Sequence, residues 1–435
     1  MAEIKPLRAW RYNHDLGRNI DLLTSPLFDV VSEKQRQALY KNPYNSIHLS
    51  VPLEPNAPER AAKTLEQWKA DGTLVQDPLP GIYVYYQFFK FAGSSKEFCR
   101  KGIICNIRAY DWNENVILRH ENTIPKAVND REILLEKTLL HASPTHGLYT
   151  DPTFEMEKYM DDAIVNPLYE TEDYQGVRDV LAIIQDANVI KAIMHNLGEK
   201  KIILADGHHR YESSLIYKHK MIQENKNDTG QEGYHFHMMF LSNTESDDLR
   251  ILPTHRVIKN LPDFTEEKVL RKLAPFFSIK PVEDPESIYE IILGKPWTFG
   301  LLFGDNAYKI RLQPEAFFDF HWPFPEEIKK LDLTIMHYFI IEKALGIIGK
   351  DQRQSESIDF DRSFSDCLAR VVRKDAQMAI ITQEVSIEDV KKVCASGHTM
   401  PQKSTYFYPK VIGGFLFGSI EEDEFRTPSY SPFRL

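Results

Sequence analysis

The chain has 435 residues, of which 42% are hydrophobic and 27% are charged, so it is long enough for two or three folded units and is not expected to be disordered. Its formal net charge of −10 disfavours a nucleic-acid partner, because DNA phosphates would be repelled. Four cysteines without a CxxC pair indicate reduced thiols in a reducing compartment rather than a disulfide framework. Neither a signal core nor an apolar run of about eighteen residues is found, so we expect a soluble cytoplasmic protein with no membrane partner.

The N-terminal third of the sequence favours short helices and aromatic strands. Ser32 has the character of an N-cap, and Pro43 is expected to end the short helix that follows it. The runs 82–93 and 102–110 are rich in tyrosine, phenylalanine and isoleucine, which is typical of half-buried strands. A helix is expected at 130–143, with four residues spaced for burial, namely Ile133, Leu134, Leu135 and Leu139.

The clearest local unit is a strand, a turn and a helix. The apolar run 201–205 predicts a buried strand, Asp206 and Gly207 form the turn, and the stretch 208–223 predicts a helix. Two flanking segments are also regular, with strand and helix signals at 176–198 and a buried strand at 234–243.

Beyond residue 262, helices and strands alternate regularly. We expect helices at 265–277, 287–294 and 333–347, and a hairpin across Asp305 built from 297–304 and 306–313. Four further segments continue the alternation, at 356–361, 363–374, 376–383 and 385–396. The tail 400–414 is polar and loop-like at first and then partly strand. Because strands and helices interleave throughout, the predicted fold class is α/β or mixed α+β.

The segment Asp206-Gly207-His208-His209-Arg210 stands where the predicted strand passes through a glycine turn into the helix. Unpaired backbone N–H groups and the helix dipole make such a helix start an anion site. Arg210 adds a bidentate phosphate donor, the two histidines can hydrogen-bond or transfer protons, and Asp206 can hold Mg²⁺. The alternative is an aspartate N-cap with surface histidines. Two adjacent histidines and an arginine on the first turn favour a functional site.

Two shorter segments carry weaker signals. His120 and Glu121 follow a strand-like run, where a surface glutamate is usually solvated. The run 401–405 places small hydroxyls beside Lys403, which suits a phosphate or a carboxylate, although a polar turn is the commoner explanation.

Other familiar motifs are missing or ambiguous. The sequence has neither GxxxxGK[ST] nor GxGxxG, which excludes a P-loop and argues against a Rossmann dinucleotide site. His235 and His237 are spaced for a metal on one face of a strand, but a packing role is favoured. His255 and Arg256 follow a proline turn. The sequence favours equally a position of these side chains facing the 206–210 box and a position away from it.

Taken together, these segments resemble a known family. The stretches 202–215, 120–123 and 402–410 look like an uncharacterised bacterial domain family of the ParB/sulfiredoxin superfamily, marked by its DGHHR box. The segments 42–49 and 252–258 fit the same family, so the resemblance covers nearly the whole chain. From about residue 110 to the tail, the order of elements is more distantly similar to that of the free-serine kinases.

The resemblance to the kinases implies a role for each matching residue. Glu121 matches the general base that accepts the proton of the substrate hydroxyl. Asp206 also matches the ligand of Mg²⁺. The implied site has three groups of residues: Glu121, Asp206 and His209 for catalysis, Gly207, His208, Arg210 and Arg131 for nucleotide phosphates, and His120, Lys403, Ser404 and Thr405 for the substrate.

The chain departs from the kinases at both ends. About 110 residues are added at the N-terminus, Gln402 and Ser404 alter the substrate loop, and Tyr406 stands where the kinases have a basic residue. The expected organisation has four parts: a β-rich N-terminal extension at 1–110, a ParB/sulfiredoxin-like catalytic domain at 111–260, a second α/β domain at 261–384, and a C-terminal segment at 385–435 that returns the substrate loop to the site.

The resemblance implies a nucleotide-dependent phosphotransferase that moves a phosphate from ATP or ADP to a small hydroxyl metabolite such as free serine, with Mg²⁺ as cofactor. A homodimer is one role open to the added N-terminal residues. Two alternatives stay open: a ParB-like switch that binds and slowly hydrolyses nucleotide, and a non-catalytic protein that binds a phosphorylated metabolite.

Overall fold

The structure is a computed structural model that describes residues 2–28, 30–91, 95–173, 175–349, 351–352, 355–401 and 403–426. The chain divides into two compact units. Unit 1 comprises Met1–Arg119, Thr123–Arg250 and Pro409–Leu435, and unit 2 comprises His120–Asn122 and Ile251–Tyr408.

Among the described residues, unit 1 contains a large sheet, several helices and two short strand pairs. Its strands are β1 (Ile4–Lys5), β2 (Trp10–Tyr12), β3 (Leu74–Gln76), β4 (Ile82–Lys90), β5 (Glu97–Arg108), β6 (Ile117–Arg119), β7 (Leu140–His141), β8 (Thr145–Tyr149), β9 (Tyr169–Glu172), β10 (Arg178–Ile184), β11 (Ile202–Asp206), β12 (Phe236–Asn243) and β21 (Gly418–Ser419). Its α-helices are α1 (His14–Gly17), α2 (Glu33–Leu39), α3 (Ile47–Ser50), α4 (Ala57–Ala70), α5 (Pro125–Thr138), α6 (Glu157–Ile164), α7 (Ala187–Gly198), α8 (His208–Glu224) and α15 (Glu422–Phe425). Three 3₁₀ turns complete it, η1 (Ile20–Leu22), η2 (Trp112–Glu114) and η3 (Gly233–His235).

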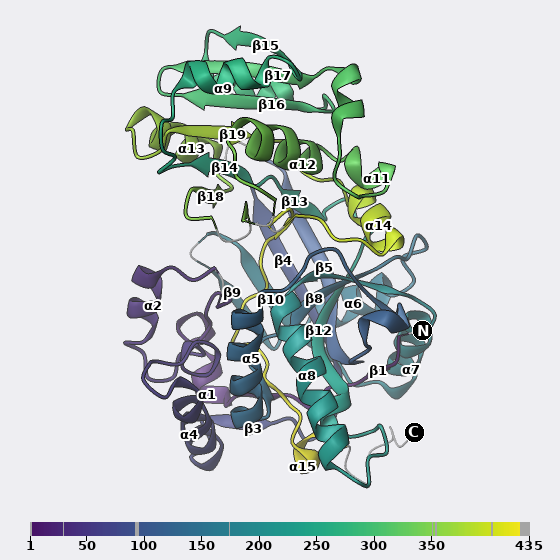
Figure 1. Ribbon diagram of the computed structural model, residues 1–435. Coiled ribbons are helices and arrows are strands. Elements are labelled where there is room, and N and C mark those ends of the chain that lie inside the picture. Colours follow the sequence, from purple (N-terminus) through teal and green to yellow (C-terminus); the bar gives the residue numbers. More distant parts are fainter. Residues whose placement is uncertain are drawn as a thin grey trace. The chain divides into compact units, whose positions relative to one another are not determined.

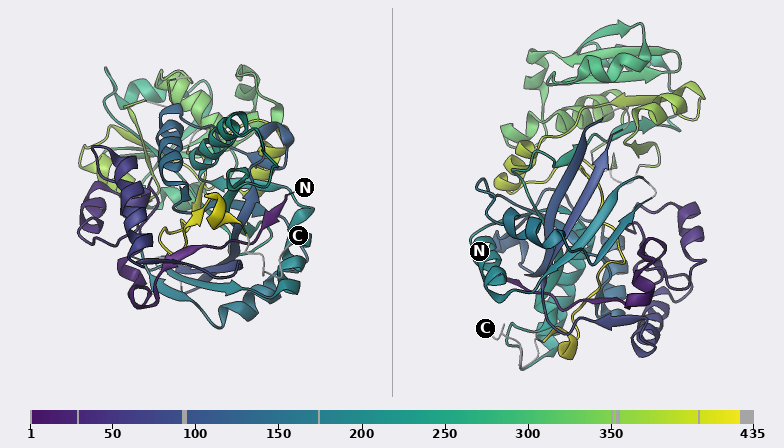
Figure 2. Two further views of the ribbon diagram at one scale, coloured as in Figure 1. Left: turned by 90° about the horizontal axis from the view of Figure 1, so that it is seen from below. Right: turned by 180° about the vertical axis from the view of Figure 1, so that it is seen from behind.

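The large sheet of unit 1 is mixed, with the strand order β6-β11-β8-β12-β5-β4-β10-β9 and with β1 paired to β5. β11 runs parallel to β6 and antiparallel to β8, whereas β12 runs parallel to β8 and antiparallel to β5. The helices α5 and α8 lie side by side (Figure 1), and Figure 2 shows β4 and β5 as long blue strands of this sheet. The predicted α/β class is confirmed.

Alternation along the central strands separates two cores. On β4 and β5, Val84 and Ile103 belong to one core, which also contains buried residues of α6 and α7. Their neighbours Tyr85 and Ile104 point to the opposite core, which contains residues of β2, β3 and α4 and of the tail from Val411 to Phe417. Successive strand residues face opposite sides of a sheet, so both faces of this sheet are covered and its strands are apolar on both sides.

Unit 2 is built on a six-stranded sheet with the order β15-β17-β16-β19-β14-β18, and its strand pairs are antiparallel. Its strands are β13 (Arg250–Leu252), β14 (His255–Ile258), β15 (Phe277–Val282), β16 (Thr298–Phe303), β17 (Asn306–Leu312), β18 (Ile358–Asp361), β19 (Met378–Ile381) and β20 (Tyr406–Tyr408). Its helices are α9 (Glu266–Leu273), η4 (Pro285–Ser287), α10 (Ile288–Ile292), η5 (Pro314–Asp319), α11 (Glu326–Lys329), α12 (Asp332–Ile335), η6 (Met336–Ala344), α13 (Phe364–Val372) and α14 (Ile387–Ser396).

Most of the predicted elements are confirmed. Ser32 caps α2 with a full capping box, the strand–turn–helix unit is β11 followed by α8, and the hairpin across Asp305 is β16–β17. The four cysteines are free thiols, as the sequence predicts. Residues 92 and 93, at the end of the predicted strand 82–93, lie outside the described residues.

Three predicted helices are wrong in extent or type. α5 begins at Pro125, whose fixed φ suits a first turn, and it ends before Leu139, which has a left-handed φ of 49°. Ile133 is 39% exposed rather than buried. α9 stops at Leu273, and Phe277 opens β15. The long helix expected at 333–347 continues past α12 as the π-helix η6.

The two units follow different boundaries from the four predicted parts. The described part of the first 110 residues contains the helices α1 to α4 and the 3₁₀ turn η1 as well as strands, and β4 and β5 lie inside the large sheet of unit 1. The segment 385–435 is divided, because residues up to Tyr408 belong to unit 2 and those from Pro409 belong to unit 1. Across the described residues, no helix combines the length and apolar character that a membrane span requires.

Candidate functional site

The turn between β11 and α8 forms the centre of the site in unit 1. Gly207 has a φ of 88°, and a Cβ at this position would lie 2.6 Å from Cγ2 of Thr145 and 2.9 Å from Nη2 of Arg210. Glycine is required, because no other residue combines this left-handed backbone with so close an approach. The 17-residue helix α8 therefore starts directly at the turn, with Arg210 in its first turn and its N-terminal amides at the end of β11.

Asp206 is held between two cations. Its Oδ1 accepts a hydrogen bond from Nζ of Lys410, and its Oδ2 lies 3.4 Å from Nη2 of Arg210. Burial by itself raises the pKa of Asp206, but the charges of Lys410 and Arg210 outweigh burial and hold this pKa below its usual value. The carboxylate is therefore ionised at neutral pH and aligns two cations at the start of α8.

Arg210 is anchored on the loop that precedes β8. Its Nη1 donates to Oγ of Ser143 at 2.8 Å and to the carbonyl oxygen of Pro144 at 2.9 Å. Sequence reasoning misses Ser143, Pro144 and Lys410. Lys410 ends the 402–410 segment, so a signal for it was present, but its pairing with Asp206 spans 204 residues of sequence.

The two adjacent histidines of the box have different surroundings. Nε2 of His209 accepts a hydrogen bond from the backbone N–H of Ile124 at 3.0 Å. An acceptor nitrogen carries no proton, so the ring is neutral and its proton is on Nδ1. His208 is 7% exposed and packs into unit 1.

Two further histidines, His141 and His237, are buried close to Arg210 of the box. His237 bonds through Nδ1 to Oγ of Ser214 at 2.8 Å and through Nε2 to Oγ1 of Thr145 at 3.0 Å. The ring of His141 lies 4.5 Å from that of His237, and burial, aided by the charge of Arg210, lowers the pKa of His141 to about 3. These buried neutral imidazoles join β7, β8, β12 and α8 and are not candidates for proton transfer with solvent.

Arg131 and Arg210 line one cavity of about 50 Å³ in unit 1. Nη1 of Arg131 donates to the carbonyl oxygen of Ser50 at 2.6 Å, Nη2 pairs with Asp130 at 2.5 Å, and the guanidinium lies 4.6 Å from the ring centroid of Phe28. The cavity has room for a few water molecules, at roughly 10–15 Å³ for each, and not for a nucleotide. Arg131 and Arg210 therefore line the same cavity, and Arg131 makes its hydrogen bonds to Ser50 and Asp130.

A buried polar chain supports Lys410. Nε2 of Gln87 donates to Oδ1 of Asp179 at 2.8 Å and to the carbonyl oxygen of Lys410 at 3.0 Å. Arg100 is 1% exposed and donates to Oε1 of Gln87 and to the carbonyl oxygen of Pro409. Side chains of β4, β5 and β10 thus fix the backbone at 409–410, and this places the ammonium of Lys410 against Asp206.

Asp179, at the far end of this chain of hydrogen bonds, leads to a prediction of how the stability of the fold depends on pH. Complete burial raises its pKa from 3.8 to about 7, although Tyr85 and Gln87 donate to it. The folded chain therefore keeps a proton that the unfolded chain loses, and stability falls as the pH rises from about 4 to about 7. Asp179→Asn is expected to remove this loss and to be more stable than the parent at pH 8, by up to roughly 4 kcal/mol.

Thermal unfolding at pH 5 and pH 8 measures the effect. The exposed Asp162 is the matched control, and Asp162→Asn should follow the parent at both pH values. Equal losses of Tm between pH 5 and pH 8 in the parent and in Asp179→Asn would show that Asp179 is ionised in the folded chain throughout.

In unit 2, the segment His120–Asn122 lies beside the loop 399–405. The backbone N–H of Met400 donates to the carbonyl oxygen of His120 at 2.7 Å, and Nδ2 of Asn122 donates to Oγ1 of Thr399 at 2.8 Å. Two segments predicted separately from the sequence are therefore brought together within unit 2.

Glu121 is held by this loop. Its Oε1 accepts the backbone N–H of Lys403 at 2.9 Å, and Nε2 of His120 bonds to Oγ1 of Thr405 at 2.7 Å. The hydroxyl of Ser404 is buried and donates to the carbonyl oxygen of Pro401, so Ser404 closes its own turn. Gln402 lies outside the described residues. Glu121, His120, Lys403 and Thr405 thus form one hydrogen-bonded group.

Arg256 is a buried cation in unit 2. Its Nη2 donates to Nε2 of His337 at 3.0 Å, and Nδ1 of His337 lies 2.6 Å from Oε1 of Gln352. Burial lowers the pKa of Arg256 to about 9, an effect that the negative charge of Glu121 opposes. Burial, together with the charge of Arg256, lowers the pKa of His337 to about 3, so this ring is neutral. Arg256 therefore supplies a positive charge to the surroundings of Glu121.

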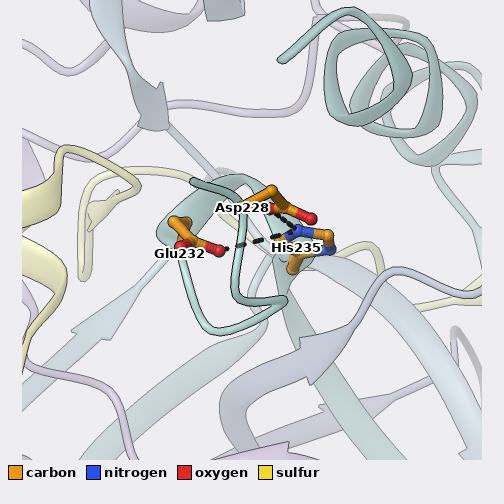
Figure 3. Close-up of side chains that lie close together, drawn as sticks. All are labelled: Asp228, Glu232 and His235. Atoms are coloured by element: carbon orange, nitrogen blue, oxygen red, sulfur yellow. Dashed lines mark hydrogen bonds and ion pairs between the residues drawn. The ribbon is translucent and has the colours of Figure 1, made fainter. Parts of the chain in front are cut away.

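Figure 3 shows a cluster of Asp228, Glu232 and His235 in the loop before β12, whose ligand atoms lie within 4.8 Å of one another. Nε2 of His235 is 2.6 Å from Oδ1 of Asp228 and 3.7 Å from Oε2 of Glu232. Asp228 also accepts the hydroxyl of Tyr234 at 2.7 Å, and Glu232 accepts the hydroxyl of Thr229 at 2.7 Å. These bonds fasten the loop, and we assign no metal to it. His237, on the strand β12 that follows, is not a member of this cluster.

Comparison with known proteins gives a family and several weak structural likenesses. The family described as "Protein of unknown function (DUF1015)" matches residues 4–334. A conserved hypothetical protein from Pyrococcus furiosus is 12% identical, with a TM-score of 0.35 over 71% of this chain and 92% of that chain. A free serine kinase in complex with AMP is 12% identical, with a TM-score of 0.38 over 74% and 93%. SbnI with C-terminal truncation from Staphylococcus aureus is 11% identical, with a TM-score of 0.35 over 71% and 85%. No curated protein matches the sequence.

Proposed function

The chain belongs to the family "Protein of unknown function (DUF1015)", and we propose that it is a nucleotide-dependent phosphotransferase that transfers a phosphate from ATP or ADP to a small hydroxyl metabolite. The observation that carries the proposal is the pair of cations, Arg210 and Lys410, that Asp206 aligns at the N-terminus of α8. The same turn also carries the sequence segment that resembles the DGHHR box expected of the free-serine kinases.

The turn supplies the donor side of the reaction. The first amides of α8 have no partner inside the helix, and the helix dipole adds positive potential at this end. Arg210 and Lys410 add two positive charges at the same end, against the one negative charge of Asp206. Phosphoryl transfer is accelerated chiefly by positioning and by neutralising charge on the transferring group. Gly207, His208 and Arg210 are therefore assigned to the nucleotide phosphates, with Arg131 as a further cation on the Arg210 cavity.

Glu121 supplies the acceptor side. Its second carboxylate oxygen is the proposed base, while the first is oriented by the N–H of Lys403. Ile124, whose N–H bonds to His209, lies three positions after Glu121, so the covalent chain alone keeps the Cα atoms of Glu121 and Ile124 within about 11 Å. This tether supports an assignment of Glu121 and the box to one reaction.

In the proposed step, the acceptor hydroxyl oxygen forms a bond to the terminal phosphorus as the bond from phosphorus to the bridging oxygen breaks. The hydroxyl proton passes to Glu121, and the shortened nucleotide leaves with the bridging oxygen. His209, with an unprotonated Nε2, is assigned a hydrogen-bonding role at the same turn. His120, Lys403, Ser404 and Thr405 form the loop that orients the acceptor.

Mg²⁺ fits the turn as an ion held by Asp206 together with nucleotide phosphates. The ion is commonly bound by one or two carboxylates together with phosphate oxygens and water. Asp206 is ionised and has two oxygens, both engaged by cations in this structure. Asp206 would hold the ion together with nucleotide phosphates once one cation turns to the phosphates instead. The bound ion would neutralise phosphate charge.

The proposal is tested by phosphorus NMR on the full-length protein incubated with ATP or ADP, Mg²⁺ and a pool of hydroxylated metabolites that includes free serine. A new phosphomonoester is the expected result. Release of inorganic phosphate alone would instead indicate a nucleotide-hydrolysing switch, and no reaction would indicate a protein that only binds phosphorylated metabolites.

A further inference from the structure

A cavity of about 540 Å³ lies within unit 2, and nothing in the proposed reaction uses it so far. We infer that this cavity receives the acceptor substrate and that the bound part of the acceptor is a flat, uncharged ring that carries the reacting hydroxyl. The inference rests on the proposed phosphotransferase function. It names a substrate class larger than free serine.

Three aromatic side chains form the walls. Trp322 is fixed by a bond from its Nε1 to Glu342 at 3.2 Å, and its ring lies 5.4 Å from Tyr338 and 5.9 Å from Phe324. Phe360 lines the cavity as well. Ligand sites with a few convergent polar groups among aromatic walls are typical for small organic molecules, and this volume falls within their usual range of about 300–1,000 Å³. Flat rings gain most from such walls through offset or edge contacts.

The charge of the lining selects against an ionic occupant. Among the described residues that line the cavity, none is a lysine, an arginine or a carboxylate. His337 is neutral, because its pKa is lowered to about 3 by burial and by Arg256. Arg256, Lys403 and Glu342 contact the lining residues His337, Phe360 and Trp322 but do not line the cavity themselves. A zwitterion such as free serine would therefore lose hydration there without a direct ion pair to a lining residue. Asn122 and Thr399, which bond to each other, can hydrogen-bond an occupant, whereas the amide of Gln352 already donates to the carbonyl oxygens of His337 and Ile347.

The position of the cavity identifies its occupant as the acceptor. Asn122 follows Glu121 directly in sequence, and Thr399, Met400 and Pro401 belong to the loop that holds Glu121. The segments that fix the proposed base thus also form one side of the cavity. His337 comes from the π-helix η6, and helices of this type occur most often at functional sites.

Saturation-transfer NMR on the full-length protein without nucleotide tests the inference with pyridoxine and uridine as ring probes and L-serine as the comparison. Both ring probes are expected to bind, and L-serine is not. Phe324→Ala should weaken ring binding about tenfold or more, because it removes a stacking wall. Phe318→Ala is the matched control, since Phe318 is 85% exposed and does not line the cavity. Circular dichroism of both variants checks that each is folded.

Three outcomes would overturn the inference: L-serine binding as well as the rings, no loss in Phe324→Ala relative to Phe318→Ala, or competition by AMP for the ring signal. The last would assign the cavity to the base of the nucleotide. Two results distinguish failure of this inference from failure of the proposed phosphotransferase function. Phosphoserine formed from ATP and L-serine, with no ring binding, would leave the phosphotransferase function standing and remove the inference. Ring binding without any phosphate transfer would remove the function.

Discussion

Glu121→Gln is expected to lower phosphate transfer by about 10²–10⁴-fold while nucleotide affinity stays within about twofold of the parent. Glutamine keeps the oxygen that accepts the N–H of Lys403 at 2.9 Å, so the loop 399–405 stays in place. It cannot take up the proton of the acceptor hydroxyl. Initial rates by phosphorus NMR and nucleotide titration by calorimetry measure the two quantities on the same preparation.

Glu283→Gln is the matched control, because Glu283 is an exposed glutamate of unit 2 that does not belong to the 399–405 loop. It should transfer phosphate at the parent rate. If Glu121→Gln or Glu121→Ala retained full activity, the base would have to be another group, although the donor site at the turn could still be correct.

Arg210→Ala is expected to weaken nucleotide binding by roughly 10–100-fold, because a charge-assisted bond contributes about 1.5–3 kcal/mol. The change also leaves Asp206 with a single cation, Lys410, and frees the oxygens of Ser143 and Pro144. The affinity should consequently become less dependent on salt concentration, since one phosphate contact is lost. Calorimetric titration with ADP at two ionic strengths measures both effects.

The control for Arg210→Ala is Arg178→Ala. Arg178 lies on β10 in the same unit, is 40% exposed, and pairs with Glu170 at 3.1 Å. Its loss should leave nucleotide affinity unchanged. An unchanged affinity in Arg210→Ala as well, with a normal Tm, would place the nucleotide away from the turn.

Local patterns in the sequence were sufficient to predict the strand, glycine turn and helix of the box. An apolar run, a glycine that must adopt a positive φ, and a helical stretch each act within a few residues, and together they gave β11, Gly207 and α8. The hairpin across Asp305 and the cap at Ser32 are local in the same sense.

Contacts between distant segments could not be predicted. The pairing of Lys410 with Asp206 and that of Lys403 with Glu121 join residues 204 and 282 positions apart. Nothing in the sequence around Arg100 or Asp179 indicates that these groups together fix the backbone beside Lys410. Such buried polar chains depend on which strands become neighbours in the sheet.

The sequence does not predict helix boundaries and helix types correctly where tertiary packing determines them. Leu139 ends α5 in a left-handed conformation that leucine seldom adopts, so the sequence favoured a longer helix. The π-helix η6 has the same apolar pattern as an α-helix and differs only in its hydrogen bonds. The added N-terminal residues look like a separate extension in sequence because their partner strands, β10 and β12, come much later in the chain.

A crystal structure with Mg²⁺ and a non-hydrolysable ATP analogue tests most directly whether the 206–210 turn and Glu121 serve one reaction. The predicted result has the phosphates about 3 Å from the first amides of α8 and from the guanidinium of Arg210, with the carboxylate of Glu121 facing the terminal phosphate across a gap that fits one hydroxyl group. Phosphates bound elsewhere, or a Glu121 separated from them by folded protein, would contradict the account.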